Sequence, residues 1–413
     1  MHDGSLIHVK DKETGLNVFE SQGFNKKVKI FIGEDQPLEA QADEEQKLFQ
    51  MLGCPGYSKK LLPLEPDSKK RRPGCVTLMF DFPENTVLHM RCEADAMMID
   101  DGEQVYPRSK IAMSKGQHIV RLIKPALYRD KEVPAFYPAC ETMLIDDAMS
   151  VDGISQSLMG VKHLILGAKC NIEKITCPVK MVSVVPENNW LEMVDGCLVR
   201  KDTKSLLFVP EGTTALPQGI KSIQNLALSN YTHDRLVIPS SVKAVTLDEI
   251  MLASASLKEL VFEEGVEDIT IDDITFLPDA RVTFPSTLKR ICMTGVSADR
   301  IEIPAACEVD RFRCSKINNL TFAGDVELRP ISYSQKVNGK TTTVYYDTFG
   351  YFSGNITFCS KVSPRLALES DDEQGSFLGK MNDDCTITVS DQATGDAIKA
   401  AADYNSNVKI TVK

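Results

Sequence analysis

The sequence contains no apolar run that approaches the ~20 residues of a membrane-spanning helix. Its first residues, Met1 to Val9, also lack the basic region and the apolar region of a secretory signal peptide. These two absences predict a chain that is neither inserted in a membrane nor exported by the usual signal-peptide route. We therefore expect a cytoplasmic location.

An excess of positive charge is also missing, because 58 Asp and Glu residues outnumber 47 Lys and Arg residues and give a net charge of −11. A surface of this sign repels phosphate backbones, so we expect no nucleic-acid partner. The one dense basic run is Lys69-Lys-Arg-Arg72. Such a run fits a nuclear localisation signal or an anion-binding patch, and equally an ordinary solvated loop.

Cysteine is too sparse for a disulfide scaffold, since there are 12 in 413 residues and no C-x2-C pair. Two pairs share a C-x6-C spacing that matches no zinc site. They are Cys170 with Cys177 and Cys307 with Cys314. Cys177, Cys292 and Cys359 occupy apolar repeat positions, where a small hydrophobic residue would serve. The pattern predicts buried, reduced thiols, which again favours the cytoplasm.

The sequence shows no nucleotide-binding glycine-rich loop, no G-x-S-x-G elbow and no H-E-x-x-H motif. The six histidines have no metal-ligand spacing, and His163 lies in an apolar run that predicts a core position. Four acidic pairs are best explained as solvated loops, because adjacent residues on a strand point to opposite faces. These pairs begin at Asp146, Asp272, Asp371 and Asp383. We expect no enzyme, no metal and no cofactor, and keep a hydrolase built on an acidic cluster as an alternative.

The chain divides into three predicted parts. Residues 1–72 form a β/α segment with short strands at 6–9 and 28–32, a helix over 37–52 and the basic linker. Residues 73–130 form a small β-sandwich-like domain, in which Val76, Leu78, Phe80 and Phe82 alternate as in a half-buried strand. Further strands are expected at 87–92, 97–99, 111–113 and 118–123. The stretch from Met98 to Gly102 and the later Lys115-Gly-Gln-His-Ile-Val120 resemble the PEGA type of small β-domain.

The rest of the chain, residues 131–413, repeats one phrase, in which two apolar-polar-apolar triplets flank a turn. Copies start at Leu236, Leu260 and Val282, and shorter copies start at Ile301 and Leu320. A repeat of this period indicates a stacked solenoid, in which each unit buries its apolar face against its neighbours. The predicted fold class is therefore mostly β with short helices, an α/β solenoid preceded by a β-rich module.

Several motifs in this region resemble the BspA-type leucine-rich repeat. Asp195-Gly-Cys-Leu198, Lys201-Asp202, Leu206-Leu207 and Pro210 match its "DGVLY-KD-TLL-YP" segment, and Ile238-Pro239, Ser241-Val242 and Val245 match its "IP-SV-I" phrase. Phe276, Phe349 and Phe377 match its core phenylalanine, without the preceding alanine. The resemblance implies an irregular array that binds proteins or surfaces.

The array is expected to end in a strand-helix-strand cap over 386–413 and to carry a hairpin insertion at 331–346. In the hairpin, Asn338-Gly339 supplies the positive φ values of a type I′ turn between two β-rich segments. Aromatic residues concentrate there and suit a binding hot spot, or alternatively pack the hairpin onto the adjacent coil. The candidate partner-binding residues are Tyr333, Tyr345, Tyr346, Tyr351 and Phe352.

The leading functional hypothesis is a non-enzymatic recognition module that binds a partner protein through the solenoid face and the aromatic hairpin. A second hypothesis is a structural or adhesin component of a surface, phage or virion assembly, for which self-association is expected. A third is an intracellular sensor or effector subunit. The sequence does not identify the partner.

Overall fold

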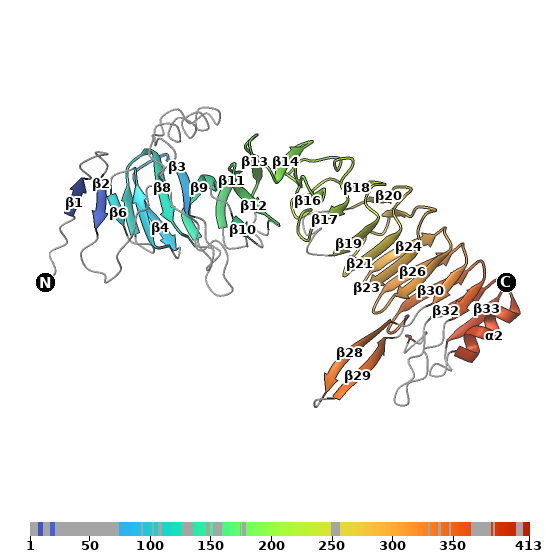
Figure 1. The fold of residues 1–413 in the computed structure, drawn as a ribbon. Coiled ribbons are helices and arrows are strands. Elements are labelled where there is room, and N and C mark those ends of the chain that lie inside the picture. Colours follow the sequence, from blue (N-terminus) through green and yellow to red (C-terminus); the bar gives the residue numbers. More distant parts are fainter. Residues whose placement is uncertain are drawn as a thin grey trace. The chain divides into compact units, whose positions relative to one another are not determined.

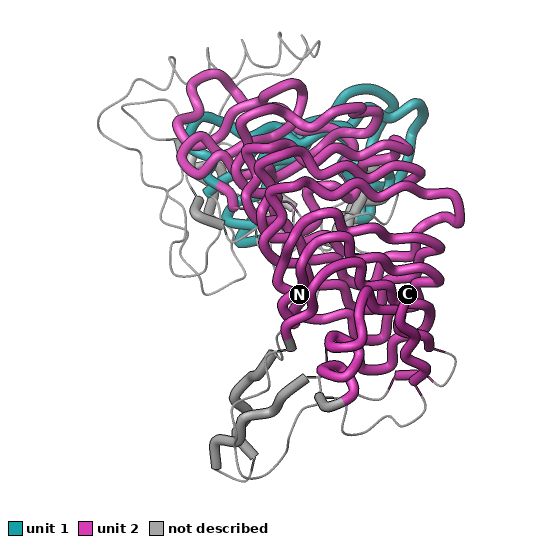
Figure 2. The backbone as a smooth tube through the Cα atoms, turned by 90° about the vertical axis from the view of Figure 1, so that its right-hand side faces the viewer, with its two compact units in different colours: residues 1–151, 157–171 teal, residues 152–156, 172–413 magenta. Residues whose placement is uncertain are grey.

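A computed structural model of the chain describes residues 7–10, 17–20, 74–91, 94–100, 103–105, 110–125, 135–145, 149–151, 159–173, 175, 179–248, 257–328, 331–337, 340–346, 348–364, 381–382, 385–401 and 408–413. These residues are mostly strands (Figure 1). The chain forms two compact units, coloured separately in Figure 2. The first comprises Met1–Val151 with Ser157–Asn171, and the second comprises Asp152–Gln156 with Ile172–Lys413.

The first unit contains a mainly antiparallel sheet with the strand order β11-β9-β3-β8-β5-β6, to which β4 and β7 are joined through β9. Its strands are β3 (Cys75–Phe82), β4 (Thr86–Arg91), β5 (Ala96–Ile99), β6 (Glu103–Val105), β7 (Lys110–Met113), β8 (Gly116–Ile123), β9 (Ala135–Ile145) and β11 (Met159–Leu166). Two short pairs accompany it, β1 (Ile7–Lys10) with β2 (Asn17–Glu20) and β10 (Met149–Val151) with β12 (Cys170–Ile172). The strands expected at 6–9, 76–82, 87–92, 97–99, 111–113 and 118–123 are confirmed to within two residues at each end.

Two expectations for this unit were wrong. β3 is not half-buried, because it lies between β8 and β9 and is buried on both faces except at Asp81. The array was also expected from residue 131 onward, whereas β9 and β11 pair with each other in the sheet of the first unit. The strand predicted at 28–32, the helix at 37–52 and the basic run Lys69–Arg72 lie outside the described residues.

The second unit begins with β13 (Met181–Val184) and a short meander of β14 (Leu191–Val194), β15 (Cys197–Arg200) and β16 (Ser205–Phe208), which is joined in parallel by β17 (Ser222–Ile223). Asp195 and Gly196 connect β14 to β15, with φ of 49° and 79°. Two successive positive φ values form the type I′ turn that suits a two-residue hairpin. The Asp-Gly part of the repeat-like motif is therefore a hairpin turn.

The remaining strands coil into a β-solenoid, so the predicted fold class is confirmed. One side of the coil carries two parallel sheets, β18-β20-β22 and β24-β26-β30-β32-β33. The second sheet continues the first, because β24 lies beside β22. These strands are β18 (Arg235–Ile238), β20 (Glu259–Phe262), β22 (Arg281–Thr283), β24 (Ser297–Ile303), β26 (Lys316–Phe322), β30 (Ser353–Phe358), β32 (Thr386–Val389) and β33 (Lys409–Val412).

The other side carries one six-stranded parallel sheet, β19-β21-β23-β25-β27-β31. Its strands are β19 (Ala244–Asp248), β21 (Asp268–Asp272), β23 (Arg290–Thr294), β25 (Cys307–Arg311), β27 (Val326–Leu328) and β31 (Val362–Pro364). Each repeat phrase of the sequence places one strand in each sheet. The turn between them closes when Val242 N–H donates to Pro239 O at 3.0 Å, and Leu288 N–H donates to Pro285 O at 3.3 Å.

Parallel pairing stacks identical positions of successive coils into ladders that fill the core. In one ladder Ile303, Phe322, Phe358 and Val389 are each at most 1% exposed. The rings of Phe322 and Phe358 stack at 5.2 Å between centroids. Burial of these aromatic and branched side chains is the main stabilising term of the solenoid.

The predicted cap is present at the end of the coil. β32 leads into α2 (Gln392–Ala401), and β33 then pairs in parallel with β32. Asp391 caps the helix, since its two carboxylate oxygens accept hydrogen bonds from Thr394 N–H at 2.8 Å and Thr394 Oγ1 at 2.9 Å. The helix was expected over Ala397–Ala402 and begins five residues earlier, at Gln392.

The predicted hairpin is also present. β28 (Ile331–Val337) and β29 (Lys340–Tyr346) pair antiparallel in a register that leaves residues 338 and 339 as the loop. The two strands form a sheet of their own, which projects from the solenoid between β27 and β30 (Figure 1). The structure describes the backbone of these strands but not their side chains.

Candidate functional site

Successive coils of the solenoid turn through one repeated corner. Asp273, Gly295, Cys314 and Tyr351 all have positive φ, between 54° and 65°. The N–H of each of the first three donates to the carbonyl just before the next corner residue, at 2.7, 2.9 and 2.8 Å. These hydrogen bonds show that the four residues are stacked equivalents, and we call them the corner ladder.

The hairpin is inserted between the third and fourth members of this ladder, Cys314 and Tyr351. Along one sheet, Ser297 pairs with Lys316, 19 residues later, whereas Lys316 pairs with Ser353, 37 residues later. The hairpin-bearing coil therefore contains 18 additional residues. The corner conformation is nevertheless retained after the insertion, because Tyr351 has a φ of 58° and Cys314, one coil earlier, has a φ of 56°.

Tyr351, a member of the predicted site, is exposed. It keeps 51% of its surface accessible, and the guanidinium carbon of Arg313 lies 5.7 Å from its ring centroid. Positive φ is uncommon for a large side chain other than Asn or Asp and costs on the order of 1–3 kcal/mol. A strained, exposed aromatic residue beside a cation, next to an inserted hairpin, has the properties of a binding anchor.

Phe352 was expected at the same surface, and this expectation was wrong. Its side chain is fully buried, and its ring packs edge-on against Phe349 at 5.7 Å. Phe349 in turn contacts Phe312 at the same centroid distance. Phe352 follows the corner residue, where the chain enters β30 and turns toward the core, so it stabilises the coil.

The three hairpin tyrosines separate into two sets by register. Side chains alternate between the faces of a strand, so Tyr333 and Tyr346 share one face with Ile331 and Val344, and Tyr345 occupies the other face. One face of the ribbon is thus rich in apolar residues. The other carries Ser332, Ser334, Lys336, Thr341 and Thr343. The sequence prediction had treated the three tyrosines as one cluster.

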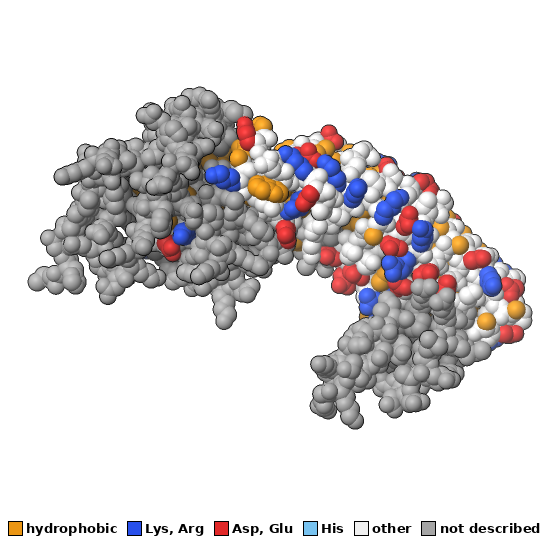
Figure 3. Space-filling model, in the orientation of Figure 1, with side chains coloured by type: hydrophobic (Ala, Val, Ile, Leu, Met, Phe, Trp, Pro, Cys, Tyr) orange, Lys and Arg blue, Asp and Glu red, His pale blue; other side chains and the backbone are white. Residues whose placement is uncertain are grey.

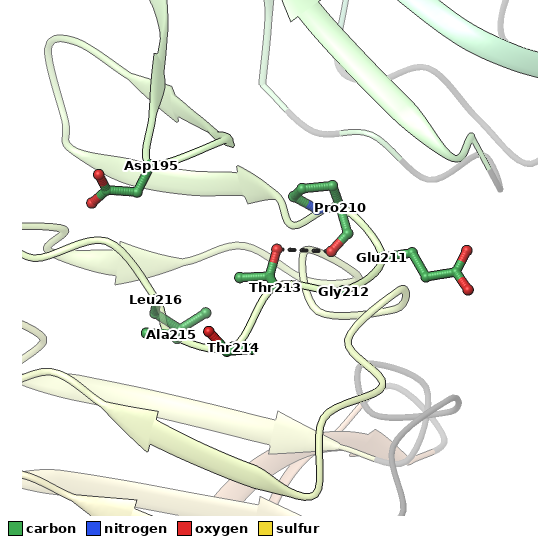
Figure 4. Close-up of a pocket in the computed structure, with 8 residues that line it drawn as sticks. All are labelled: Asp195, Pro210, Glu211, Gly212, Thr213, Thr214, Ala215 and Leu216. Atoms are coloured by element: carbon green, nitrogen blue, oxygen red, sulfur yellow. Dashed lines mark hydrogen bonds between the residues drawn. The ribbon is translucent and has the colours of Figure 1, made fainter.

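A pocket of about 460 Å³ lies at the other end of the array, between the Asp195 turn and the loop 210–216. The loop is fixed by Thr213, whose hydroxyl donates to Pro210 O at 2.8 Å. The carboxylates of Asp195 and Glu211 point away from each other (Figure 4). The lining is polar, and the two carboxylates do not converge on a common point.

The first unit contains a Ser-His-Asp arrangement that the sequence analysis missed. His118 Nδ1 lies 2.6 Å from Asp100 Oδ2, and His118 Nε2 lies 3.1 Å from Ser114 Oγ. Nε2 also lies 3.0 Å from the Ser114 carbonyl, which can only accept a hydrogen bond. A neutral imidazole that donates from Nδ1 to Asp100 has no proton on Nε2, so Nε2 can accept a hydrogen bond from the Ser114 hydroxyl. These contacts tie the residue after β5 to the β7–β8 turn.

Of the four acidic pairs, Asp272-Asp273 lies in the described residues, and Asp272 stands in register with Asp248 of the preceding coil. Asp272 ends β21 and its partly buried carboxyl has a raised pKa, because burial disfavours the charged form. Asp273 is the corner residue that follows. The pairs at Asp146, Asp371 and Asp383 lie outside the described residues. His163 is partly buried, and its pKa is lowered by that burial.

None of the nine described cysteines forms a disulfide, and seven of them are buried. Burial raises the pKa of Cys140 and Cys307 to about 12, which makes these thiols unreactive. Cys314 and Cys359 are exposed, so the expectation of a buried Cys359 was wrong. Cys177 lies outside the described residues. Within the described part of the chain, no three His, Cys, Asp or Glu side chains gather as metal ligands.

The solenoid surface carries both charge signs in close alternation (Figure 3). Ion pairs link neighbouring coils, as between Arg235 and Glu259 at 2.8 Å and between Arg290 and Asp268 at 2.9 Å. Exposed pairs of this kind contribute little stability, on the order of 0–1 kcal/mol each. None of the described helices has the length and apolarity needed to cross a membrane.

Comparisons with known proteins give limited information. No protein-family model and no curated protein matches the chain. Among solved structures, the chain is similar to the pneumococcal vaccine antigen PcpA, with 15% identity and a TM-score of 0.34. The match covers 65% of this chain and 59% of that chain, so it spans less than two thirds of the antigen's length. The resemblance to the BspA-type repeat stays a prediction.

Proposed function

We propose that the chain is a non-enzymatic recognition protein that binds a partner protein through the β28–β29 hairpin and the adjacent corner of the solenoid. We call this surface, formed by β28, β29, Arg313 and Tyr351, the hairpin-corner site. The observation that supports it best is the 18-residue insertion at a corner whose backbone conformation is unchanged. The coil does not need the insertion to close its turn, so the insertion is available for another task.

The chemistry of the site also suits binding. Tyr351 and Arg313 combine a large aromatic surface with a cation, and these residue types are enriched among interface residues that dominate affinity. By register, one face of the hairpin carries five apolar or aromatic residues together with Gln335, Lys340 and Thr342. The mixed charges of the solenoid surface would not favour one partner over another. The face of the projecting hairpin provides a more specific surface for a partner.

The test is site-specific photo-crosslinking with the intact chain. A photoreactive phenylalanine analogue replaces Tyr351 in one variant and Leu277 in the control. Leu277 is exposed by 39% on the same unit, away from the hairpin, and is therefore a matched position. We expect a discrete protein adduct from position 351 and none from position 277.

A second variant links the adduct to the hairpin. Deletion of residues 330–347 removes 18 residues and restores the 19-residue spacing of the preceding coil. The adduct at position 351 is expected to disappear in this variant. Equal adducts from positions 351 and 277, or an adduct that survives the deletion, would contradict the assignment of the site.

A further inference from the structure

We infer that the partner recognised by the hairpin is a second copy of this chain, through antiparallel pairing of β29 with the β29 of the other copy. The inference rests on the proposed function, because it identifies the partner of the same site. Three features of the hairpin support it: the free edge of β29, the composition of that edge, and the register that self-pairing would give.

The first feature is the free edge. Among the described strands, β28 and β29 pair only with each other, so each has one edge that no described strand covers. The residues that flank a two-residue loop form a hydrogen-bonded pair, and such pairs alternate along an antiparallel ladder. Lys340, Thr342, Val344 and Tyr346 therefore direct their backbone groups toward β28. The N–H and C=O groups of Thr341, Thr343 and Tyr345 face the open edge.

The second feature is the composition of that edge. Thr341 to Tyr346 is a run of six residues rich in β-branched and aromatic side chains, with no charge and no proline. A run of this kind is typical of strands that pair with another chain. The hairpin has no acidic residue between Ile331 and Tyr346, so two copies of it cannot form ion pairs with each other.

The third feature is the register of self-pairing. A two-fold axis at Thr343 places Thr343 opposite its equivalent and Thr341 opposite Tyr345 of the other copy. The outward backbone groups of these residues then form the hydrogen-bonded pairs. The single charge, Lys340, stands opposite an aromatic residue, Tyr346, and not opposite another lysine. The interface is therefore self-complementary, as a two-fold contact requires.

The edge of β33 provides a contrast in the same molecule. Among the described strands it is the last of its sheet, so one of its edges has no described strand beside it. Self-pairing about Thr411 would place Lys409 opposite Lys413 of the second copy, and like charges opposite each other are unfavourable. Lysine on an edge strand is a common device against such pairing. The β29 edge lacks this protection at its centre.

The geometry also explains how the hairpin gains stability. A two-stranded hairpin is marginal in water, whereas three or more strands with an apolar face are stable. Pairing of two copies gives the four-stranded sheet β28-β29-β29-β28, in which the apolar faces of both hairpins are continuous. The second copy thus supplies additional strands to a hairpin that pairs with no other described strand.

The experiment is sedimentation velocity with light scattering on the full chain and three variants. Thr343→Pro removes the outward N–H at the two-fold axis without removing a hydrogen bond between β28 and β29. Ser334→Pro is the matched control, because Ser334 pairs with Thr343 and directs its N–H to the opposite, unused edge. Thr343→Lys places two like charges at the axis.

The full chain and Ser334→Pro are expected to form dimers with similar dissociation constants. Thr343→Pro and Thr343→Lys are expected to weaken the dimer by about tenfold or more, since edge hydrogen bonds are lost or charges repel. A full chain that stays monomeric up to about 100 µM, beyond the range of most specific contacts, would overturn the inference. Dimers that are equally strong in all variants would overturn it as well.

The outcomes also separate this inference from the proposed function. If the photoreactive group at position 351 yields a hairpin-dependent adduct with a mass other than twice that of the chain, and the full chain is monomeric, self-pairing is wrong and the recognition site stands. If no hairpin-dependent adduct forms and the protein is monomeric, both are wrong. A hairpin-dependent adduct of twice the chain mass supports both.

Discussion

Two neighbouring coils of the solenoid, β25–β26 and β27–β30, have the same corner and different contents. The first passes from Arg311 through Phe312, Arg313 and Cys314 without interruption. The second contains the hairpin and then passes through Thr348, Phe349, Gly350 and Tyr351. Phe312 N–H donates to Thr348 O at 2.5 Å and Cys314 N–H donates to Gly350 O at 2.8 Å, so the two corners remain in register.

The comparison separates the contacts that determine the backbone path of a coil from the positions at which its length and residues can vary. Buried ladders and inter-coil hydrogen bonds fix the path of the backbone on both sides of the insertion. The corner itself faces solvent at Tyr351, where a longer segment is accommodated without changing the buried positions. Structural residues and candidate binding residues therefore alternate over very short distances, as in Tyr351 and Phe352.

The largest effect is expected where the two coils share their core. Phe322 is fully buried, stacks on Phe358 across the two coils and contacts Phe312 at 5.7 Å. Phe322→Ala should reduce the free energy of unfolding by about 3–5 kcal/mol, because it removes aromatic contacts and leaves a cavity. Chemical denaturation followed by circular dichroism measures the loss. An effect below 1 kcal/mol would show that the ladder is not continuous across the insertion.

A similar loss is expected from the close approach of the coils beneath the hairpin. Gly354 has a φ of 125°, and a Cβ there would lie 1.8 Å from the carbonyl oxygen of Ile317. Gly354→Ala should cost about 3 kcal/mol, since it combines backbone strain with a clash against a fixed carbonyl. The same measurement on Gly196→Ala is the control for positive φ alone, because nothing lies within 4 Å of that position.

A smaller effect is expected at the opposite turn of the same two coils. Asp325 accepts hydrogen bonds from Ser360 Oγ and from Lys361 N–H, and these bonds lower the pKa of its carboxyl. A carboxyl whose pKa is lower in the folded chain than in the unfolded chain stabilises the fold at pH values above its unfolded pKa of about 4. This stabilisation is lost as the pH falls through the folded pKa. Stability should therefore decrease on acidification below pH 4, and Asp325→Asn should flatten this decrease. An unchanged profile in the variant would assign the acid sensitivity to other carboxylates.

Tyr351→Ala is expected to affect stability least among the substitutions. Its ring is half-exposed, and the interaction with Arg313 contributes less than about 1 kcal/mol at such a site. Partner binding should nevertheless fall by at least about tenfold, because the aromatic anchor is removed. Thermal unfolding and a binding titration with the same protein sample measure the two effects. Loss of stability with unchanged binding would identify Tyr351 as a structural residue.

Much of this architecture could be predicted from local sequence patterns. The alternation in 75–123, the Asn-Gly hairpin and the terminal strand-helix-strand each depend on contacts within a few residues. The strands β9 and β11 were assigned to the wrong unit because their pairing depends on distant segments. The burial of β3 on both faces has the same cause, since it is the neighbouring strands and layers that cover it.

The candidate site was only partly predictable for a related reason. The sequence located the aromatic cluster, but Tyr351 and Phe352 are adjacent and differ only in which side of the backbone they occupy. The positive φ at Cys314 and Tyr351 has no residue signature, because neither is glycine or asparagine. The pairing of His118 with Asp100 also escaped prediction, since the two residues meet through the register of β5 and β8. A short Ser-x3-His spacing was the only available signal.

The central claim is that the hairpin is added to a coil that does not need it. The most direct test is the free energy of unfolding of the chain that lacks residues 330–347, compared with the full chain under the same conditions. The account predicts a difference within about 1 kcal/mol, because the corner and the buried ladders are retained. A loss of about 3 kcal/mol or more would contradict it and would make the hairpin part of the solenoid's own core.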